Sequence, residues 1–406
     1  MEVDEIKRIV EGGCIIAVLA CKILLATFTP LTIDLAYVMS YYSTFPSLPS
    51  TYFISLIVGF WSILPVDHPI LSTAWNIEVF LPSLGMYLLV FLMKLPLLVI
   101  DLLAGVLLYR TVIKNGLDSR RASFAFWAWY LNPYVVVNEI WGALDLLPTL
   151  LILAAFVMLR EKRYVRGSLA LLASTTTQFF SVLLIPAFPA LWRRTRQSML
   201  VLFGGLVGAT IYLLRVIQFG YDPSLFLSHP YYEEYLIAPL SQPVGMATMA
   251  LAIAFLIVWR AWPRDEKAML DSFLVVLLML FAFMANWFPQ FFVLVIPFLV
   301  LDITLQGRSI SYLVVLTTSG LVMNVIAFVN YFTANGLAFF FIPVSGNQLL
   351  QLAMNNYVKL ATSPFSVLVI GQFAQAAFTA TCIVYALALV QERTGLLGKI
   401  VDVIHI

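Results

Sequence analysis

Three groups of polar side chains interrupt a very apolar sequence and could carry chemistry. The first is Asp34, which follows the stiff entry Thr29–Ile33 directly after the first apolar stretch. A carboxylate at the edge of an apolar environment has a raised proton affinity, so it can act as a general base near neutral pH. Asp34 is therefore the predicted catalytic residue. The alternative is an interfacial acid that contacts water.

The second group lies in the segment 131–148, between two apolar stretches, and contains Asn138, Glu139, Trp141 and Asp145. A charged group inside a bilayer costs about 2.5 to 3.5 kcal/mol on insertion scales, so its presence there indicates a functional site. We predict that these four residues form the substrate-binding or structural floor of a cavity. A short loop that reaches water is the simpler interpretation.

The third group is the loop 220–235, which contains His229, Tyr231, Glu233 and Glu234. Aromatic rings stack on sugar faces, and acids accept hydrogen bonds from sugar hydroxyls, so this composition suits a carbohydrate. It equally suits an ordinary interfacial belt of tyrosines.

Several other charged residues fall within or near apolar stretches. Arg215 could meet a lipid phosphate through a bidentate contact, or could anchor ordinary headgroups. Asp101 and Asp302 are predicted to be structural, either neutral or ion-paired, because they lie inside predicted spans. Lys22 is the predicted partner of such an acid.

The composition identifies the environment of the chain. With 406 residues, 62% of them hydrophobic, 11% charged and a mean hydropathy of +0.96, it has too little polar surface for a soluble globule. A net charge of +2 gives no argument for nucleic-acid binding. The three cysteines lie in apolar stretches without metal-ligand spacing, and no phosphate loop or nucleophile elbow occurs. No cofactor or metal is predicted.

The elements that must position these groups are membrane helices. We predict an all-α, polytopic fold of about 10–12 transmembrane helices with re-entrant or interfacial helices. Residues 167–191 should form two short helices that enter and return, and residues 52–93, with prolines 65, 69 and 82, should be interfacial or re-entrant. The remaining apolar runs predict spans at 13–31, 94–112, 122–138, 145–160, 198–218, 243–261, 268–286, 290–306, 309–330 and 365–390.

The distribution of Lys and Arg predicts the orientation. Most basic residues cluster in the short connections that a cytoplasmic amino terminus places inside, which obeys the positive-inside rule. The loops 32–93, 219–243 and 331–364 then lie outside and form the predicted active-site face of a single integral membrane domain, 1–406. The expected location is the plasma membrane in a prokaryote or the endoplasmic reticulum membrane in a eukaryote.

Several segments together resemble a known family. They are 94–110 (KLPLLVIDLLAGVLLYR), 116–122 (GLDSRRA), 129–133 (WYLNP), 141–145 (WGALD) and 286–297 (NWFPQFFVLVIP). This pattern resembles the GT-C superfamily of multi-span glycosyltransferases. The likeness is greatest to the enzymes that add the first mannose in GPI-anchor synthesis and to their prokaryotic relatives. It is good from about 94 to 190 and patchy at 286–300.

The resemblance implies a function. Members take a sugar from a polyprenyl-phosphate carrier on the outer or lumenal face, with an aspartate of the first outer loop as base; here the position falls on Asp34. The sugar would be mannose, and the acceptor a lipid or glycan. Gln290 lies in the segment that matches the start of a late span and is carried over as substrate-binding. Membrane lipids and a small accessory subunit are further partners that the family allows. A non-catalytic transporter of lipid-linked glycans, or a scaffold subunit of the same fold, is the alternative.

The sequence departs from the family pattern at two places. The first loop offers one acid where the GPI enzymes carry two acids separated by one residue, so no paired-acid metal site is predicted. Gln178 stands in the re-entrant segment where those enzymes have a lysine. Gln178 is assigned to substrate binding, and Arg215 or Lys359 is predicted to meet the carrier phosphate.

Overall fold

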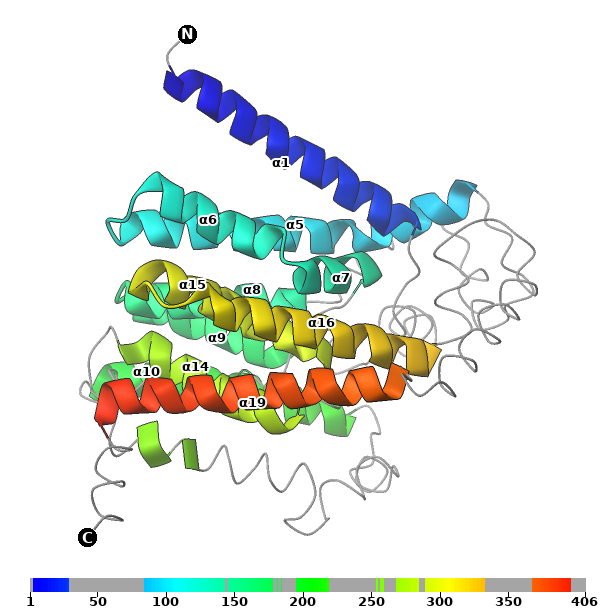
Figure 1. The fold of residues 1–406 in the computed structure, drawn as a ribbon. Coiled ribbons are helices and arrows are strands. Elements are labelled where there is room, and N and C mark those ends of the chain that lie inside the picture. Colours follow the sequence, from blue (N-terminus) through cyan, green and yellow to red (C-terminus); the bar gives the residue numbers. More distant parts are fainter. Residues whose placement is uncertain are drawn as a thin grey trace.

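The fold is a bundle of helices that lie side by side (Figure 1). The computed structural model of the chain describes residues 3–28, 84–142, 145–177, 181, 184, 195–218, 253–254, 256–258, 268–284, 289–332 and 367–395. Within these ranges all regular structure is helical, and no strand occurs. The predicted all-α class is therefore confirmed for this part of the chain.

Twelve helical elements account for most of the described residues. Short turns at 115–118, 161–163 and 307–309 connect consecutive helices at one end of the bundle, where α19 also ends. The elements are α1 (Val3–Phe28), α5 (Leu84–Lys114), α6 (Ser119–Tyr130), α7 (Pro133–Trp141), α8 (Leu146–Arg160), α9 (Tyr164–Thr177), α10 (Thr195–Gln218), α14 (Ala268–Met284), the 3-10 helix η4 (Pro289–Leu294), α15 (Ile296–Gln306), α16 (Ile310–Phe332) and α19 (Val367–Thr394).

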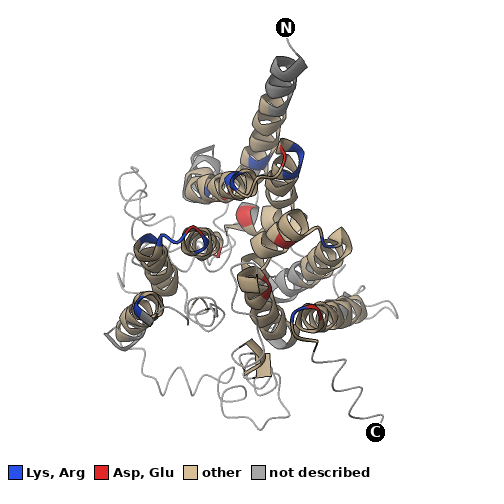
Figure 2. Ribbon diagram, turned by 90° about the vertical axis from the view of Figure 1, so that its left-hand side faces the viewer, with Lys and Arg blue, Asp and Glu red and all other residues tan. Residues whose placement is uncertain are grey.

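The end with the short turns, which we call the basic end, carries most of the described Lys and Arg residues (Figure 2). Left-handed backbone makes these turns possible, with φ of 78° at Gly116, 62° at Lys162 and 71° at Gly307. Asp118 then caps α6, since its side chain accepts a hydrogen bond from the backbone N–H of Arg121. The opposite end, where α1, α7 and α16 end, is called the far end.

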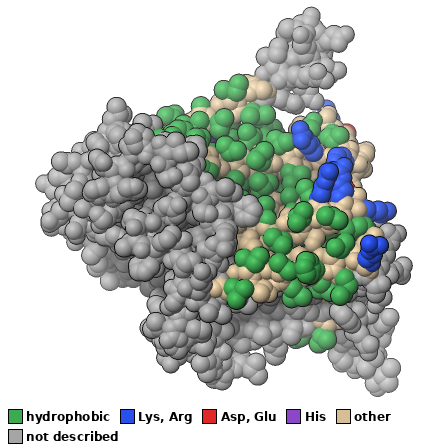
Figure 3. All heavy atoms as spheres, turned by 180° about the vertical axis from the view of Figure 1, so that it is seen from behind, with side chains coloured by type: hydrophobic (Ala, Val, Ile, Leu, Met, Phe, Trp, Pro, Cys, Tyr) green, Lys and Arg blue, Asp and Glu red, His purple; other side chains and the backbone are tan. Residues whose placement is uncertain are grey.

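The surface of the bundle is apolar, whereas several charged groups lie inside it. Large hydrophobic side chains on the outer helices are 36–73% exposed, while Lys22, Lys94, Asp101 and Glu139 are buried. Figure 3 shows the apolar surface extending from a row of basic side chains. Within the described ranges, two helical segments are long and apolar enough to cross a bilayer, namely Lys94–Lys114 and Val369–Thr394.

Three predicted spans have different boundaries in the structure. The span predicted at 122–138 is wrong as a single helix, because Asn132 and Pro133 end α6 and begin α7. Proline lacks a backbone N–H and disfavours helical geometry in the residue before it, so the helix breaks there. The span predicted at 290–306 is also divided, into η4 and α15. The helix predicted at 94–112 is longer in the structure. Helix α5 begins at Leu84, so it includes the last part of the segment 52–93.

Other predicted elements are described only in part. Helix α9 covers 164–177 and agrees with the first short helix predicted within 167–191. The return of that segment lies outside the described residues, except for Ser181 and Leu184. Most of the predicted span 243–261 and of the loops 32–93, 219–243 and 331–364 also lies outside them.

Helices α9 and α10 pack with almost no space between their backbones. A Cβ atom added at Gly204 would lie 2.6 Å from the backbone oxygen of Ser168, and one added at Gly208 would lie 2.8 Å from that of Leu172. These glycines have the Gly-x-x-x-Gly spacing, which lets two apolar helices approach closely and pack by van der Waals contact. Ser168 adds a hydrogen bond of 2.5 Å from its hydroxyl to the backbone oxygen of Leu200.

This packing predicts that Gly208→Ala destabilises the protein. The new methyl group must displace the α9 backbone, which we expect to cost about 1–3 kcal/mol of unfolding free energy. Thermal unfolding of the purified protein in detergent measures this. Gly13→Ala is the matched control, because nothing lies within 4 Å of a Cβ at Gly13. An equal unfolding temperature for the two variants would contradict the packing argument.

Candidate functional site

The main candidate site is a buried cluster of one lysine and two carboxylates, which we call the lysine–carboxylate cluster. Lys22 of α1 forms an ion pair with Asp101 of α5, and its Nζ atom lies 2.6 Å from Oε2 of Glu139 in α7. The side chains of all three residues are at most 3% exposed. Three helices that are separate in the sequence therefore meet at one ammonium group. The predicted pairing of Lys22 with an acid of another apolar helix is confirmed.

A second lysine holds the same helices together from the other side. Lys94 of α5 is fully buried, and its Nζ atom donates a hydrogen bond of 3.1 Å to the backbone oxygen of Ala26. Ala26 lies in the last turn of α1, where carbonyl groups have no partner within the helix. Lysines therefore cross between α1 and α5 in both directions.

Two aromatic residues of α6 complete the surroundings of the cluster. The ring of Tyr130 lies 3.9 Å from Nζ of Lys22, which is a cation–π contact. The indole Nε1–H of Trp129 donates a hydrogen bond of 3.1 Å to the backbone oxygen of Asp101. Both aromatic side chains are fully buried. They exclude water from the ion pairs and fix the backbone of α5 beside them.

The position of Glu139 depends on the short helix α7. The Asn132 side chain caps its start by accepting hydrogen bonds from the backbone N–H groups of Tyr134 and Val135, at 3.0 and 3.4 Å. The Asn132 amide also donates to Thr317 of α16 at 3.1 Å. Gly142 ends the helix with a φ of 82°, a conformation that favours glycine. Both ends of α7 are thus fixed by local sequence.

The depth of the cluster follows from its place on α5. Asp101 precedes Lys114 by 13 residues, which is about 20 Å along the helix axis from the basic end. Lys22 lies six residues before the end of α1 at Phe28 and Glu139 two residues before the end of α7 at Trp141, so the cluster lies close to the far ends of these two helices and near the middle of α5. Oδ1 of Asp101 and Oε1 of Glu139 are buried without a hydrogen-bond donor among the described residues. Such oxygens can accept hydrogen bonds from hydroxyl groups or from water.

Two further predicted site residues lie near the cluster. Asn138 is 1% exposed, and its amide donates a hydrogen bond of 2.8 Å to the backbone oxygen of Tyr134. Asp145 is 6% exposed and directly precedes α8, where its backbone oxygen accepts from the hydroxyl of Thr149 at 2.6 Å. The structure thus places Asn138 and Glu139 in the last turn of α7 and Asp145 directly before α8.

The other predicted site residues cannot be placed beside the cluster. Trp141, Gln290 and Arg215 lie in α7, η4 and α10, but their side chains are outside the described part of the structure. The remaining predicted residues also lie outside it: Asp34, Gln178, His229, Tyr231, Glu233, Glu234 and Lys359.

A second ionic network lies at the basic end and joins α14, α15 and α19. The guanidinium of Arg308 contacts Asp271 at 2.7 Å and Glu392 at 2.9 Å and also pairs with Asp302. The hydroxyl of Tyr385 donates to Asp302. Asp302 therefore has the structural, ion-paired role predicted for it, as Asp101 does.

Sequence reasoning missed the centre of this network. Asp271 is fully buried in the apolar helix α14 and binds both Arg308 and Arg393. A lone acid in an apolar helix was the available signal, because such a residue needs a cation from elsewhere. Burial lowers the pKa of Arg308, but its hydrogen bonds to Asp271 and the attraction of Asp302 raise that pKa above its usual range. The guanidinium is therefore charged at all physiological pH values.

Comparisons with known proteins add no relative. No protein-family profile matches the sequence, no curated protein matches it, and no solved structure matches the fold. The described residues also contain no group of three or more His, Cys, Asp or Glu side chains that could hold a metal ion.

The lysine–carboxylate cluster predicts a large effect for Lys22→Met. Removal of the ammonium leaves two buried carboxylates without a cation, which we expect to lower the unfolding free energy by about 3–5 kcal/mol. Lys114→Met is the matched control, since Lys114 pairs with Glu161 at the surface with a 56% exposed side chain, where a pair contributes less than about 1 kcal/mol.

The measurement is thermal unfolding of both variants in the same detergent. The triple variant Lys22→Met, Asp101→Asn, Glu139→Gln should recover much of the lost stability, because it removes the unpaired charges. If Lys22→Met unfolds at the same temperature as Lys114→Met, the cluster does not hold the helices together.

Proposed function

We propose that the chain is a multi-pass membrane glycosyltransferase of the GT-C type. It transfers a sugar, with mannose the first to test, from a polyprenyl-phosphate carrier to a lipid or glycan acceptor on the outer face. The observation that carries the proposal is the lysine–carboxylate cluster, which lies below the far end of a bundle whose surface is apolar. The sequence resemblance adds the reaction type.

The distribution of polar and apolar groups supports a membrane environment. The described surface exposes large apolar side chains at helical spacing, such as Val99 and Leu103 on α5 and Phe373, Val384 and Leu387 on α19. The interior is mainly apolar but also holds ion pairs, and charged side chains are seldom buried completely in a water-soluble bundle. Basic residues gather at one end, as the positive-inside rule requires for the cytoplasmic face.

Native cysteines provide a direct test of this environment. Cys14 and Cys21 are exposed on α1, and Cys382 is buried. If lipid covers α1, a charged maleimide cannot modify Cys14 or Cys21 in intact membranes, because the reactive thiolate does not form in an apolar medium. Both should react after the protein is unfolded in sodium dodecyl sulfate.

The positive control is Ser119→Cys, which places a thiol at an exposed position of the basic end. This residue should react in inverted vesicles. Rapid labelling of Cys14 and Cys21 in intact membranes would show that water reaches α1, and this part of the proposal would then be wrong.

The geometry of the far end supports the proposed site. Helix α1 ends at Phe28, six residues before Asp34, and Lys22 lies about 9 Å below that end. The same lysine binds Glu139, which precedes the turn to Asp145. The chain that leads to the predicted base and the segment predicted to bind substrate are therefore tied to one ammonium group. We propose that the cluster is the rigid floor on which the outer loops assemble the active site.

The proposed reaction has one chemical step. Asp34 takes the proton of the acceptor hydroxyl, and the resulting oxygen attacks the anomeric carbon of the carrier-bound sugar. The bond from that carbon to the carrier phosphate breaks on the opposite face, so the configuration inverts. The phosphate leaves with the electron pair as an anion, and a cation, for which Arg215 and Lys359 are the candidates, stabilises its charge. General-base catalysis contributes about 10²- to 10⁴-fold in such a step.

Asp34→Asn should therefore lower transfer by about 100-fold or more while leaving the unfolding temperature unchanged. The assay is transfer of radiolabelled mannose from polyprenyl-phosphate mannose to endogenous acceptors in membranes. Asp118→Asn is the matched control, because it lies at the basic end and asparagine caps a helix as well as aspartate does. Full transfer by Asp34→Asn would exclude this residue as the base.

One observation favours a second function, the transport of a lipid-linked glycan. Two interrupted helical segments pack together, since Tyr134 beyond the break between α6 and α7 contacts Phe292 of η4 with ring centroids 5.8 Å apart. Interrupted helices and buried charges also occur at the binding sites of transporters. Movement of the carrier-linked sugar across vesicles, without transfer to an acceptor, would support this function over the transferase.

A further inference from the structure

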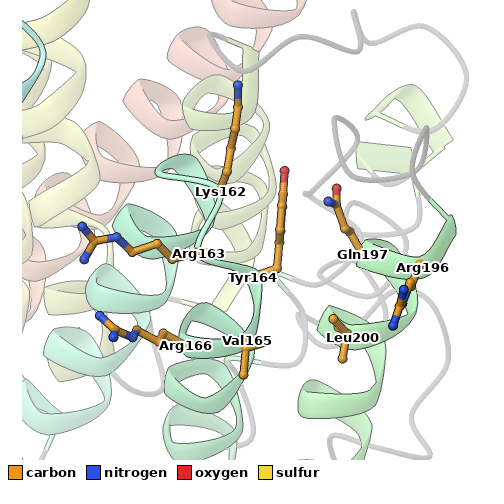
Figure 4. Close-up of a pocket in the computed structure, with 8 residues that line it drawn as sticks. All are labelled: Lys162, Arg163, Tyr164, Val165, Arg166, Arg196, Gln197 and Leu200. Carbon is orange, nitrogen blue, oxygen red and sulfur yellow. The ribbon is translucent and has the colours of Figure 1, made fainter.

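A pocket at the basic end is separate from the proposed active site. It lies between the turn that joins α8 to α9 and the first turn of α10, and its volume is about 780 Å³ (Figure 4). This is within the range of about 300–1,000 Å³ that small-molecule sites occupy. Its lining consists of eight residues, Lys162–Arg166 of the turn and α9, and Arg196, Gln197 and Leu200 of α10.

The lining of this pocket is positively charged. Four of its side chains are Lys or Arg, and no acidic side chain lines it. The nearby acid, Glu161, is engaged by Lys114 at 2.7 Å and by Arg163 at 3.2 Å. In Figure 4 Lys162 and Arg196 come from the two elements that flank the pocket and extend in different directions, whereas Arg163 and Arg166 point away from α10. Lys162 and Arg196 are therefore best placed to attract an anion into it.

The neutral residues of the pocket add hydrogen-bonding groups. In Figure 4 the hydroxyl of Tyr164 and the carboxamide of Gln197 point in the same direction from neighbouring helices. The Gln197 Oε1 atom is buried and has no hydrogen-bond partner among the described residues. A buried acceptor of this kind needs a donor, and a hydroxyl group of a ligand can supply one. The ligand chemistry is thus an anion that also carries hydroxyl groups.

An apolar surface begins at the floor of the pocket. Val165 and Leu200 belong to the lining, and one turn further along the same helices Leu169 and Phe203 are 59% and 65% exposed. Figure 3 shows basic side chains at this edge of the molecule and apolar side chains directly beside them. A ligand that fills the pocket and also covers these side chains must combine a charged head with an apolar tail.

We propose that this pocket binds the headgroup of an anionic phospholipid that carries hydroxyl groups, and that phosphatidylglycerol is such a ligand. Lys162 and Arg196 attract the phosphate to the pocket, a headgroup hydroxyl donates to Gln197, and the acyl chains cover α9 and α10. This inference rests on the proposed membrane location and is independent of sugar transfer. Basic pockets between helices on the cytoplasmic side are favourable sites for such headgroups.

The positive-inside rule alone gives a different expectation. That rule requires only that Lys and Arg residues lie near the cytoplasmic face. It therefore predicts that cations at any turn of the basic end contribute equally to the binding of anionic lipid. Arg120 and Arg121 of α6 are exposed at that end but do not line the pocket. The pocket therefore predicts a difference between these arginines and the pair Lys162 and Arg196.

The test uses the purified full chain in a non-ionic detergent, with bound lipid counted by native mass spectrometry. Short-chain phosphatidylglycerol and phosphatidylcholine with the same acyl chains are titrated in parallel. We expect one phosphatidylglycerol to bind in preference to phosphatidylcholine. The double variant K162Q/R196Q should bind it about 30-fold more weakly, since each cation near an anionic headgroup contributes about a fivefold factor. The double variant R120Q/R121Q, with the same change in charge, should stay within about threefold.

Three results would overturn the proposal: equal binding of the two lipids to the unchanged protein, unchanged phosphatidylglycerol binding by K162Q/R196Q, or an equal loss in both double variants. Displacement of the lipid by millimolar inorganic phosphate would identify a site for free phosphate instead. The cysteine labelling described above tests the membrane location separately. If Cys14 and Cys21 do not react with the maleimide and the protein also binds the two lipids equally, the lipid-binding proposal is wrong. The proposed function is then unaffected.

Discussion

Neutralisation of buried charge is the constraint on which this structure depends. Lys22, Asp101 and Glu139 lie in three different helices and are almost completely buried, so none of them is tolerable without the others. Breaking a buried pair from one side costs about 3–5 kcal/mol, which is comparable to the stability of a whole domain. Helices α1, α5 and α7 must therefore meet at this point.

The same constraint operates at the basic end with different groups. Asp271 and Asp302 in α14 and α15 require Arg308 and Arg393, which hold α19 against them. Apolar helices surrounded by lipid gain little from hydrophobic contact with one another, so polar contacts and close packing select their neighbours. Between α9 and α10, whose described residues form no buried ion pair, the glycines of α10 allow the close backbone contact that makes these two helices neighbours. Ion pairs and close backbone contact thus have the same structural role.

The proposed site makes use of this rigidity. Glu139 was singled out by sequence as a polar residue with a functional role, and in the structure its carboxylate is bound to Lys22, whose ammonium lies over the ring of Tyr130. It fixes the end of α7 and the turn toward Asp145. A fixed end of α7 is consistent with the proposed catalysis by Asp34.

The sequence by itself determined the helical class, the short turns and the gathering of cations at one end, because these depend on composition and on residues close in the chain. It also predicted a structural role, neutral or ion-paired, for Asp101 and Asp302. It did not determine where the helix after Ser119 breaks, and it assigned Glu139 and Lys22 to separate features. Lys22 and Asp101 are 79 residues apart, and no local pattern encodes which helices become neighbours. Only the tertiary structure decided these pairings, since a buried charge accepts whichever partner the packing of helices brings within reach.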